Sequence, residues 1–327
     1  MIVIVGAGSV GLVMGARLAA SGTPILFLTR SEADARSIER DGLVVEELPS
    51  GKLTEAQALA TSDPGRALEA AGSDPILFCT RASQLPIVAQ ELAQEPAAAS
   101  AVCWQNDVSS EPILAQHFDR VVGGVVRLTS TRTSPRSAVS AGTGRLILGD
   151  YPNGLGSQTE VLADKLRRAH YDVGLSTTIS QDKWLKLCIN LMSTPNALIV
   201  RSDHTTQAFV DVKKQLLEEA RTVLAAAGIA ASSCDGRDRS LDEEISYHRE
   251  SLARGTSTRN IPVYNQVWSA LTHGGPVEAD GYHRRIIGLA QQHDIPTPTN
   301  QRVLDVLLEA IRTSSGPESS RAVEFLD

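Results

Sequence analysis

Residues 1–30 read MIVIVGAGSVGLVMGARLAASGTPILFLTR, and this stretch decides the fold class. A short apolar run at 2–5 leads into the glycine turn GAGSVG at 6–11. An amphipathic helical pattern follows, and then a second apolar run at 25–28. Strand, glycine turn, helix and strand in this order are the fingerprint of a dinucleotide-binding unit.

Each glycine of this turn serves a different structural purpose in the fingerprint. Gly6 permits the tight turn, Gly8 lets the backbone approach a pyrophosphate, and Gly11 lets the helix pack closely against the strand. The start of the helix also offers free N–H groups and the positive end of its dipole. We therefore predict that this turn, including Ser9 and Val10, binds the phosphates of a dinucleotide.

The residues after the second apolar run indicate which dinucleotide is bound. A site for NAD usually carries Asp or Glu there, which holds the 2′-hydroxyl of the ribose. This chain has Thr29-Arg30-Ser31 instead. Arg30 can pair bidentately with a 2′-phosphate, and the two hydroxyls can add hydrogen bonds. The sequence favours NADPH over NADH, and the alternative for Arg30 is a solvated surface arginine.

Size and composition limit the possible classes. A chain of 327 residues predicts two domains, and its 42% hydrophobic and 21% charged residues are typical of a globular protein. The net charge of −7 argues against a nucleic-acid partner. No apolar run is long enough for a membrane span, and the first residues already form a core strand, so no signal peptide is expected. The four cysteines lack metal-ligand spacing, and we expect a cytoplasmic protein without a metal.

The two halves of the chain have different periodicities. The first half alternates strand and helix patterns, which predicts a Rossmann-type, doubly wound α/β sheet. Strands are expected at 42–48, 53–61, 75–80, 101–105, 121–128 and 144–149, and helices at 84–94 and 159–170. The turn at Ser50-Gly51 could join the strands at 42–48 and 53–61 as a hairpin. The second half has helical spacing throughout. Helices are expected at 181–198, 206–227, 242–253, 282–292 and 300–312.

These patterns define the predicted domains. We expect a dinucleotide-binding domain over 1–178 and an all-α domain for substrate binding and dimerisation over 179–316. The last residues, 317–327, are rich in Ser and Glu and are expected to fray.

A buried helix with a polar stripe is the second informative feature. The helix expected at 181–198 is apolar almost all round, yet Lys186, Asn190 and Thr194 recur every four residues and so share one face. Buried polar groups need partners or a cleft. Desolvation would lower the pKa of Lys186 and make it a proton donor near neutral pH. The alternative is a lysine that extends from the helix edge to water.

A further acidic pair, Glu278 and Asp280, follows the Gly274-Gly-Pro turn and precedes the helix expected at 282–292. Acids at that position also stabilise a helix N-terminus, which is the alternative to a role in binding.

Together these features resemble the ketopantoate reductase family over nearly the whole chain. The family motif Trp-x-Lys-Leu-x-x-Asn matches 184–190, and its late acidic motif matches 277–280. Its Gln-Asn-Gly resembles Gln105-Asn106-Asp107, and DIPTPTN at 294–300 resembles another family segment. The resemblance implies a Rossmann domain joined to a helical domain, with NADPH-dependent reduction of 2-dehydropantoate to (R)-pantoate between them.

The resemblance also implies a role for each matching position. Lys186 would be the general acid that protonates the substrate carbonyl oxygen. Glu278 would bind the substrate hydroxyl or orient Lys186, and Asn190 would hold the substrate near its carbonyl. Asn106 would contact the nicotinamide side of the cleft, and Arg81 would add to the 2′-phosphate site.

The chain departs from the family pattern on the substrate side. Thr194 replaces a second Asn, and His283 replaces the Asn that follows the acidic motif. Asn265, followed by Gln266, is the nearest counterpart of a substrate-binding Ser, and Asp107 replaces a Gly. We expect Thr194, Asn265 and His283 to bind substrate, although His283 is equally explained as a structural histidine.

The chemistry is therefore better defined than the substrate, and other readings stay open. An imine-type or opine-type reductase, or a 3-hydroxy acid dehydrogenase, would share this layout. A regulatory protein that binds NADPH without turnover is a second alternative. The expected partner is a small 2-oxo acid, and a homodimer through the helical domain fits the class.

Overall fold

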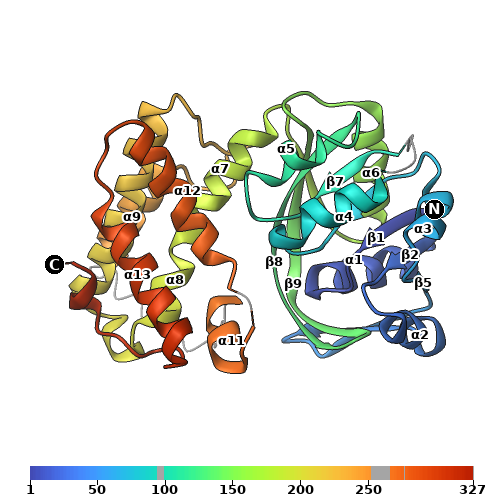
Figure 1. The fold of residues 1–327 in the computed structure, drawn as a ribbon, viewed down its shortest axis with the longest axis horizontal. Coiled ribbons are helices and arrows are strands. Elements are labelled where there is room, and N and C mark those ends of the chain that lie inside the picture. Colours follow the sequence, from blue (N-terminus) through green and yellow to red (C-terminus); the bar gives the residue numbers. More distant parts are fainter. Residues whose placement is uncertain (94–98, 252–265, 276, 327) are drawn as a thin grey trace. The chain divides into compact units, whose positions relative to one another are not determined.

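The computed structural model describes residues 1–93, 99–251, 266–275 and 277–326. It divides into two compact units, Met1–Lys183 and Trp184–Asp327. The first is an α/β unit and the second is helical (Figure 1). The division falls five residues after the predicted boundary of 178/179.

Within the described part of the first unit, ten strands form one mixed sheet. Their order is β4-β3-β9-β8-β7-β6-β1-β2-β5, and β10 pairs with β9. The bounds are β1 (Ile2–Val5), β2 (Ile25–Leu28), β3 (Leu43–Leu48), β4 (Lys52–Ala56), β5 (Leu59–Thr61), β6 (Ile76–Phe78), β7 (Ala101–Cys103), β8 (Val121–Ser134), β9 (Ser137–Asp150) and β10 (Asp172–Leu175).

Helices cover both faces of this sheet, as a doubly wound fold requires. They are α1 (Ser9–Ala20), α2 (Glu32–Asp41), α3 (Pro64–Ala71), α4 (Leu85–Leu92), α5 (Ser110–Leu114) and α6 (Ser157–Arg168). Side chains of a strand alternate between the two faces. Ile2 and Ile4 of β1 accordingly join the core under α1 and α6, whereas Val3 and Val5 join the core under α3 and α4.

The strand order reverses at β1. The chain builds β1, β2 and β5 in one direction across the sheet and then returns to add β6 and β7 on the other side of β1. All five of these strands are parallel. Ligands of such sheets bind at the carboxyl ends of the strands, where the order reverses.

Two parts of this sheet differ from the prediction. The strand expected at 53–61 is two strands: β4 forms the expected hairpin with β3, whereas β5 pairs in parallel with β2. The strands expected at 121–128 and 144–149 are parts of one long antiparallel hairpin, β8 and β9 (Figure 1). The polar residues between the two expected strands also belong to β8 and β9. Because β9 pairs with β3 as well as with β8, this part of the hairpin forms without an apolar run.

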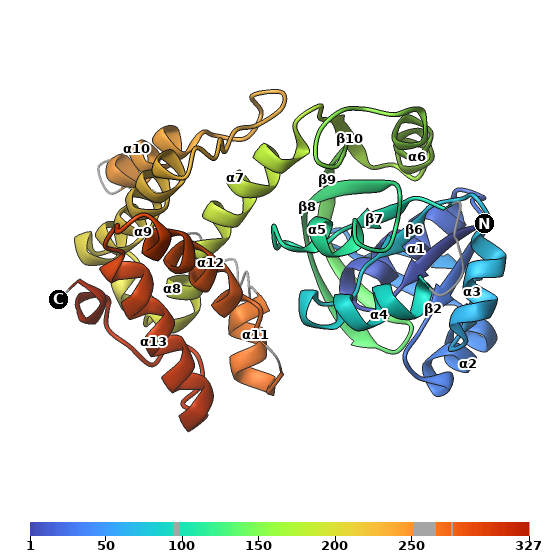
Figure 2. The ribbon, with the colours of Figure 1, turned by 45° about the horizontal axis from the view of Figure 1, so that its top comes forward.

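The second unit is built from helices. They are α7 (Ile179–Leu191), which begins in the first unit, α8 (Ser193–Leu198), α9 (Gln207–Ala226), α10 (Leu241–Ser251), α11 (Gln266–His273), α12 (Ala279–Gln292) and α13 (Pro298–Thr313). Figure 2 shows α10 alongside α9. In the described residues, none of the helices has the length and apolar character that a membrane crossing requires.

One long helix of the prediction is broken. The helix expected at 181–198 ends at Leu191, and α8 starts at Ser193 with Pro195 in its first turn. Proline has no N–H to donate and is tolerated in a first turn but not in a helix interior, which explains the break. Lys186 and Asn190 therefore share α7, whereas Thr194 belongs to α8.

The prediction that 317–327 fray is wrong for the described residues up to 326. Ser320 pairs with Ile199 in a β-bridge, and the Asp203 carboxylate accepts hydrogen bonds from the Ala322 N–H and from Arg321. The Phe325 side chain is buried. The tail is therefore held to the helical unit by contacts with residues over 100 positions earlier.

Candidate active site

The glycine turn has the geometry that its sequence predicts. Gly6 has a φ of +102°, a conformation that other residues rarely adopt. A Cβ atom at Gly11 would lie 2.2 Å from the Gly6 carbonyl oxygen, so no side chain fits there. Helix α1 consequently starts directly behind the turn, at the carboxyl end of β1.

The N-terminus of α1 carries no group of its own that would compete with an anion. Its N-cap is Gly8, which provides no side-chain hydrogen bond, and its first turn contains no acidic residue. Beside Gly8, a Cβ atom would meet only the Cys79 carbonyl oxygen, at 3.6 Å. The neighbouring Ser9 and Val10 are half-buried. Free N–H groups and room for close approach fit a pyrophosphate.

Two arginines follow the strands on either side of β1. Arg30 comes after β2 and Arg81 after β6, and both are exposed. Within the described residues, neither side chain has an ion-pair or hydrogen-bond partner. The hydroxyls expected to assist Arg30 are used by the turn itself, because Thr29 donates to the Ser31 carbonyl at 2.8 Å and the Ser31 hydroxyl caps α2. Arg30 and Arg81 are thus two cations that a phosphate could pair with.

The turn after β7 presents Asn106. Its amide group, half-buried, has no hydrogen-bond partner within the described residues. The preceding Gln105 donates from Nε2 to the carbonyls of Phe78 (3.1 Å) and Thr80 (2.8 Å) at the end of β6. The Asp107 carboxylate accepts from the Val108 N–H at 2.7 Å, so this replacement of the family glycine stabilises the turn.

In the helical unit, α7 presents the predicted acid. Lys186 and Asn190 lie one turn apart on α7, and both are half-buried. The Asn190 amide has no hydrogen-bond partner among the described residues. Both side chains therefore keep some access to solvent, as groups that bind or protonate a substrate require.

Glu278 is the N-cap residue of α12, but its side chain does not cap the helix. The carboxylate accepts a hydrogen bond from Gln266 Nε2 at 3.2 Å, which links α12 to α11. Asp280 lies in the first turn and pairs with Arg284 at 3.4 Å, as expected for a residue that stabilises the helix. Asn265, predicted to bind substrate, lies outside the described residues.

Thr194 and His283 do not fit the prediction that they bind substrate. Both are fully buried, and the Thr194 hydroxyl lies 3.0 Å from His283 Nε2. His283 Nδ1 lies 2.9 Å from the Asn300 side-chain oxygen, and Asn300 donates to Glu219 at 2.8 Å. If the neutral imidazole carries its proton on Nδ1, it donates to Asn300 and accepts from Thr194, so both ring nitrogens have a hydrogen-bond partner. The polar groups of Thr194 and His283 are therefore hydrogen-bonded to each other and to Asn300 inside the helical unit.

This network makes a prediction about pH. Burial lowers the pKa of His283 from 6.5 to about 4, so between these values the unfolded chain takes up a proton that the folded chain does not. Its contribution to stability is complete above pH 6.5 and is lost as the pH falls towards 4. We expect a loss of up to about 3 kcal/mol in the free energy of unfolding from this residue.

Urea unfolding of the wild type and of His283→Gln at pH 7 and pH 4.5 measures this effect. The variant should show a smaller loss of stability between the two values, since glutamine does not titrate. His293→Gln, at an exposed histidine, is the control and should behave as the wild type. Equal pH dependence in all three proteins would contradict the assignment.

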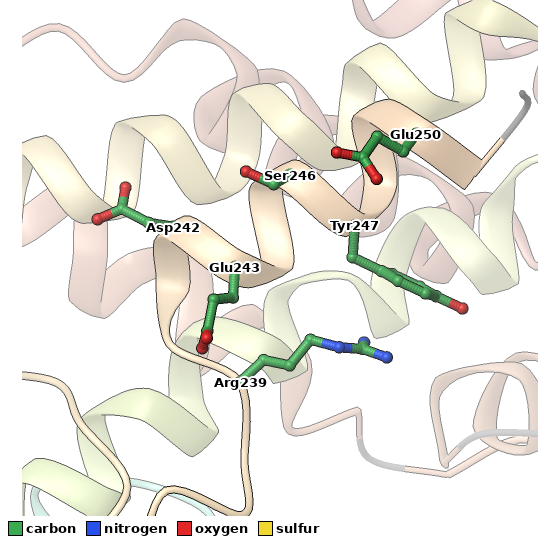
Figure 3. Close-up of a pocket in the computed structure, with 6 residues that line it drawn as sticks. All are labelled: Arg239, Asp242, Glu243, Ser246, Tyr247 and Glu250. Carbon is green, nitrogen blue, oxygen red and sulfur yellow. The ribbon is translucent and has the colours of Figure 1, made fainter.

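A pocket of about 450 Å³ lies elsewhere in the helical unit, along α10 (Figure 3). The Arg239 guanidinium lies 3.7 Å from the centre of the Tyr247 ring and pairs with Glu244 at 3.0 Å. The pocket contains none of the predicted site residues, and its acidic side chains do not form a metal site: the described residues contain no group of three or more His, Cys, Asp or Glu that could hold a metal ion.

Comparison with known families identifies the fold as a whole. Residues 2–153 match the family model "Ketopantoate reductase PanE/ApbA", and 178–310 match its C-terminal counterpart. The chain belongs to the ketopantoate reductase family. This membership confirms the family predicted from the motifs and makes the chain an oxidoreductase of that family.

Three relatives of this ketopantoate reductase family member are 17–22% identical to it. The 2-dehydropantoate 2-reductase of Halobacterium salinarum is 22% identical over 315 residues, covering 95% of this chain and 99% of the relative. The crystal structure of a family member from Ralstonia eutropha has a TM-score of 0.77 at 22% identity, covering 96% of this chain and all of that one. D-mandelate dehydrogenase with NADH and anilino(oxo)acetate has a TM-score of 0.78 at 17% identity, with 97% and 100% covered. These structures show a shared fold.

One feature of the site was not predicted. In this family member, Lys183 of α7 and Glu111 of α5 form a buried ion pair beside the Gln105–Asn106 turn. The sequence signal was a second lysine in the apolar segment that carries Lys186. That signal does not show that Lys183 pairs with Glu111 inside the protein.

Proposed function

We propose that this protein reduces a 2-oxo acid with NADPH, and that its substrate is 2-dehydropantoate, giving (R)-pantoate. The observation that carries the proposal is the bare glycine turn, flanked by two arginines that have no partner among the described residues, in a chain of the ketopantoate reductase family. A dimer through the helical unit stays a prediction.

The described residues suit the cofactor. The turn of Gly6, Gly8 and Gly11 would hold the pyrophosphate against the start of α1, together with the backbone of Ser9 and Val10. Arg30 and Arg81 would hold the 2′-phosphate, for which NADH has no counterpart. Asn106 would bind the nicotinamide end through its unpartnered amide. When bound, the reduced nicotinamide supplies a hydride for the carbonyl carbon.

The remaining chemistry belongs to the protein. The Lys186 ammonium donates a hydrogen bond to the carbonyl oxygen of the 2-oxo acid and gives it a proton as the C=O double bond becomes a C–O single bond. Its positive charge also stabilises the negative charge that develops on this oxygen. Solvent then restores the proton of the lysine amine.

Two more residues position the substrate in this proposal. Asn190, one turn after Lys186, donates its amide to the oxygens of the 2-oxo acid. Glu278 accepts the hydrogen bond of the substrate hydroxyl, while Gln266 holds its carboxylate. Because Thr194 and His283 are used elsewhere, the substrate contacts that these positions make in the family must come from other groups.

Steady-state kinetics with NADPH tests the function. The substrates to compare are 2-dehydropantoate, 2-oxoisovalerate and phenylglyoxylate, the last chosen because D-mandelate dehydrogenase shares the fold. We expect the highest kcat/KM with 2-dehydropantoate. A higher value for phenylglyoxylate would replace the substrate but keep the reaction class. Tight NADPH binding without turnover of any 2-oxo acid would favour a regulatory protein and contradict the proposal.

The cofactor preference rests on Arg30. We expect Arg30→Gln to raise the KM for NADPH about tenfold, corresponding to about 1.4 kcal/mol of lost charge pairing, and to leave the KM for NADH unchanged. Arg36→Gln is the matched control, since Arg36 is exposed on α2 but already pairs with Glu32. An equal effect of Arg30→Gln on both cofactors would contradict a 2′-phosphate contact.

A further inference from the structure

The Lys183 ammonium is the centre of a buried polar cluster in the α/β unit. It donates to the Gln105 carbonyl oxygen at 2.7 Å and to the Glu111 carboxylate, and it lies 3.7 Å from the Cys103 sulfur. The side chains of Lys183 and Glu111 are only 4% and 3% exposed. The cluster therefore joins the first turns of α7 to the end of β7 and to α5.

The surroundings of this lysine favour its charged form despite its burial. Burial opposes the charged form, but the neighbouring Cys103 and Glu111 side chains outweigh it and raise the pKa of Lys183 above its ordinary value. The Lys183 side chain is also only 4% exposed, and its ammonium donates to protein groups, so it does not face a substrate. Lys183 therefore acts through the groups that it holds.

Those groups fix both ends of the turn that carries Asn106. Before Asn106, the Gln105 carbonyl is held by Lys183 and the Gln105 amide by the end of β6. After it, Glu111 ties α5 to the same ammonium. Asn106 lies between these two anchors, and its amide has no hydrogen-bond partner in the part of the chain that the structure describes. A fixed backbone around one free amide is what precise binding of a flat ring requires.

The same ammonium also holds helix α7. Lys183 lies three residues before Lys186 on this helix. Close packing supports the anchor, because a Cβ atom at Gly123 of β8 would lie 2.8 Å from Ile179 in the first turn of α7. Buried ion pairs gain little net stability over apolar residues of similar size, so stability alone does not account for this one.

We propose that Lys183 and Glu111 are positioning residues of the reductase site, which fix the Asn106 turn and the start of the helix that carries Lys186. This inference rests on the proposed function. It assigns neither residue a contact with substrate or cofactor.

Three variants test the proposal: Lys183→Met, the double variant Lys183→Met/Glu111→Leu, and the control Lys165→Met. Lys165 pairs with Asp74 at 3.0 Å in the same unit but away from this turn. The single variant leaves a buried carboxylate without its partner, which destabilises the fold. The double variant removes both charges and should recover the urea midpoint.

The expected result separates positioning from stability. We expect kcat to fall about 10- to 100-fold in the single and double variants, with the KM for NADPH changed less than about threefold. In both, amide hydrogen exchange at Val108 and Ser109 should be faster than in the wild type. The control should match the wild type in every measurement.

A double variant that recovers both midpoint and kcat would show a merely structural pair and overturn the inference, as would unchanged exchange of these amides. If the wild type itself reduces no 2-oxo acid, the proposed function fails. The exchange measurement then still decides whether the pair fixes the turn.

Discussion

Replacing Lys186 by alanine is expected to lower kcat for the 2-oxo acid at least about 100-fold, the usual effect of losing a general acid. The substrate oxygen would then receive its proton from water, and no ammonium would stabilise its developing charge. NADPH binding, measured by the fluorescence of the reduced nicotinamide, should remain within about threefold of the wild type. The reason is that Lys186 acts on the substrate and not on the phosphates.

Lys214→Ala is the control for this variant. Lys214 belongs to the helical unit and pairs with Asp211 at 3.5 Å on α9, without a role in the proposed chemistry. Its kcat should equal that of the wild type. Unchanged turnover in Lys186→Ala would remove the lysine from the mechanism, whereas equal losses in both variants would indicate a general effect on the helical unit.

The second large effect is expected at the glycine turn. Substitution of Gly8 should weaken NADPH binding, whereas substitution of Gly11 should also destabilise the fold. A methyl group at Gly8 meets nothing closer than 3.6 Å, and its φ of −77° suits alanine. Gly8→Ala should therefore keep the free energy of unfolding within about 1 kcal/mol. It should weaken NADPH binding at least about tenfold, because the methyl group prevents close approach of the pyrophosphate.

Gly11→Ala is expected to act on the fold itself. Its methyl carbon would lie 2.2 Å from the Gly6 oxygen, so α1 must move away from β1. We expect a loss of about 1–3 kcal/mol in the free energy of unfolding, measured by urea denaturation, as well as weaker NADPH binding. If Gly8→Ala bound NADPH as the wild type does, the turn would not be the pyrophosphate site.

The sequence predicted features that depend on neighbouring residues. The turn of 6–11 could be predicted in detail because its strand, glycines and helix lie within thirty residues and constrain each other directly. The alternation of strands and helices likewise predicted the doubly wound sheet. Long strands without an apolar run, such as the polar ends of β8 and β9, could not be predicted, because a third strand supports their pairing.

Features that depend on distant residues were missed or misread. The tail looked frayed by composition, but Asp203 holds it from 119 positions away. His283 and Thr194 were assigned to substrate because the family has Asn there, yet their polar atoms satisfy each other across 89 positions. Lys183 and Lys186 look alike in sequence, and the buried pair of Lys183 with Glu111 depends on a residue 72 positions earlier.

A crystal structure with NADPH and an unreactive 2-oxo acid analogue tests the central claim most directly. We expect Lys186 Nζ within about 3 Å of the carbonyl oxygen, with the nicotinamide ring facing the carbonyl carbon and Arg30 on the 2′-phosphate. A complex in which the Lys186 ammonium points into water, away from the bound ligand, would contradict the proposed reduction.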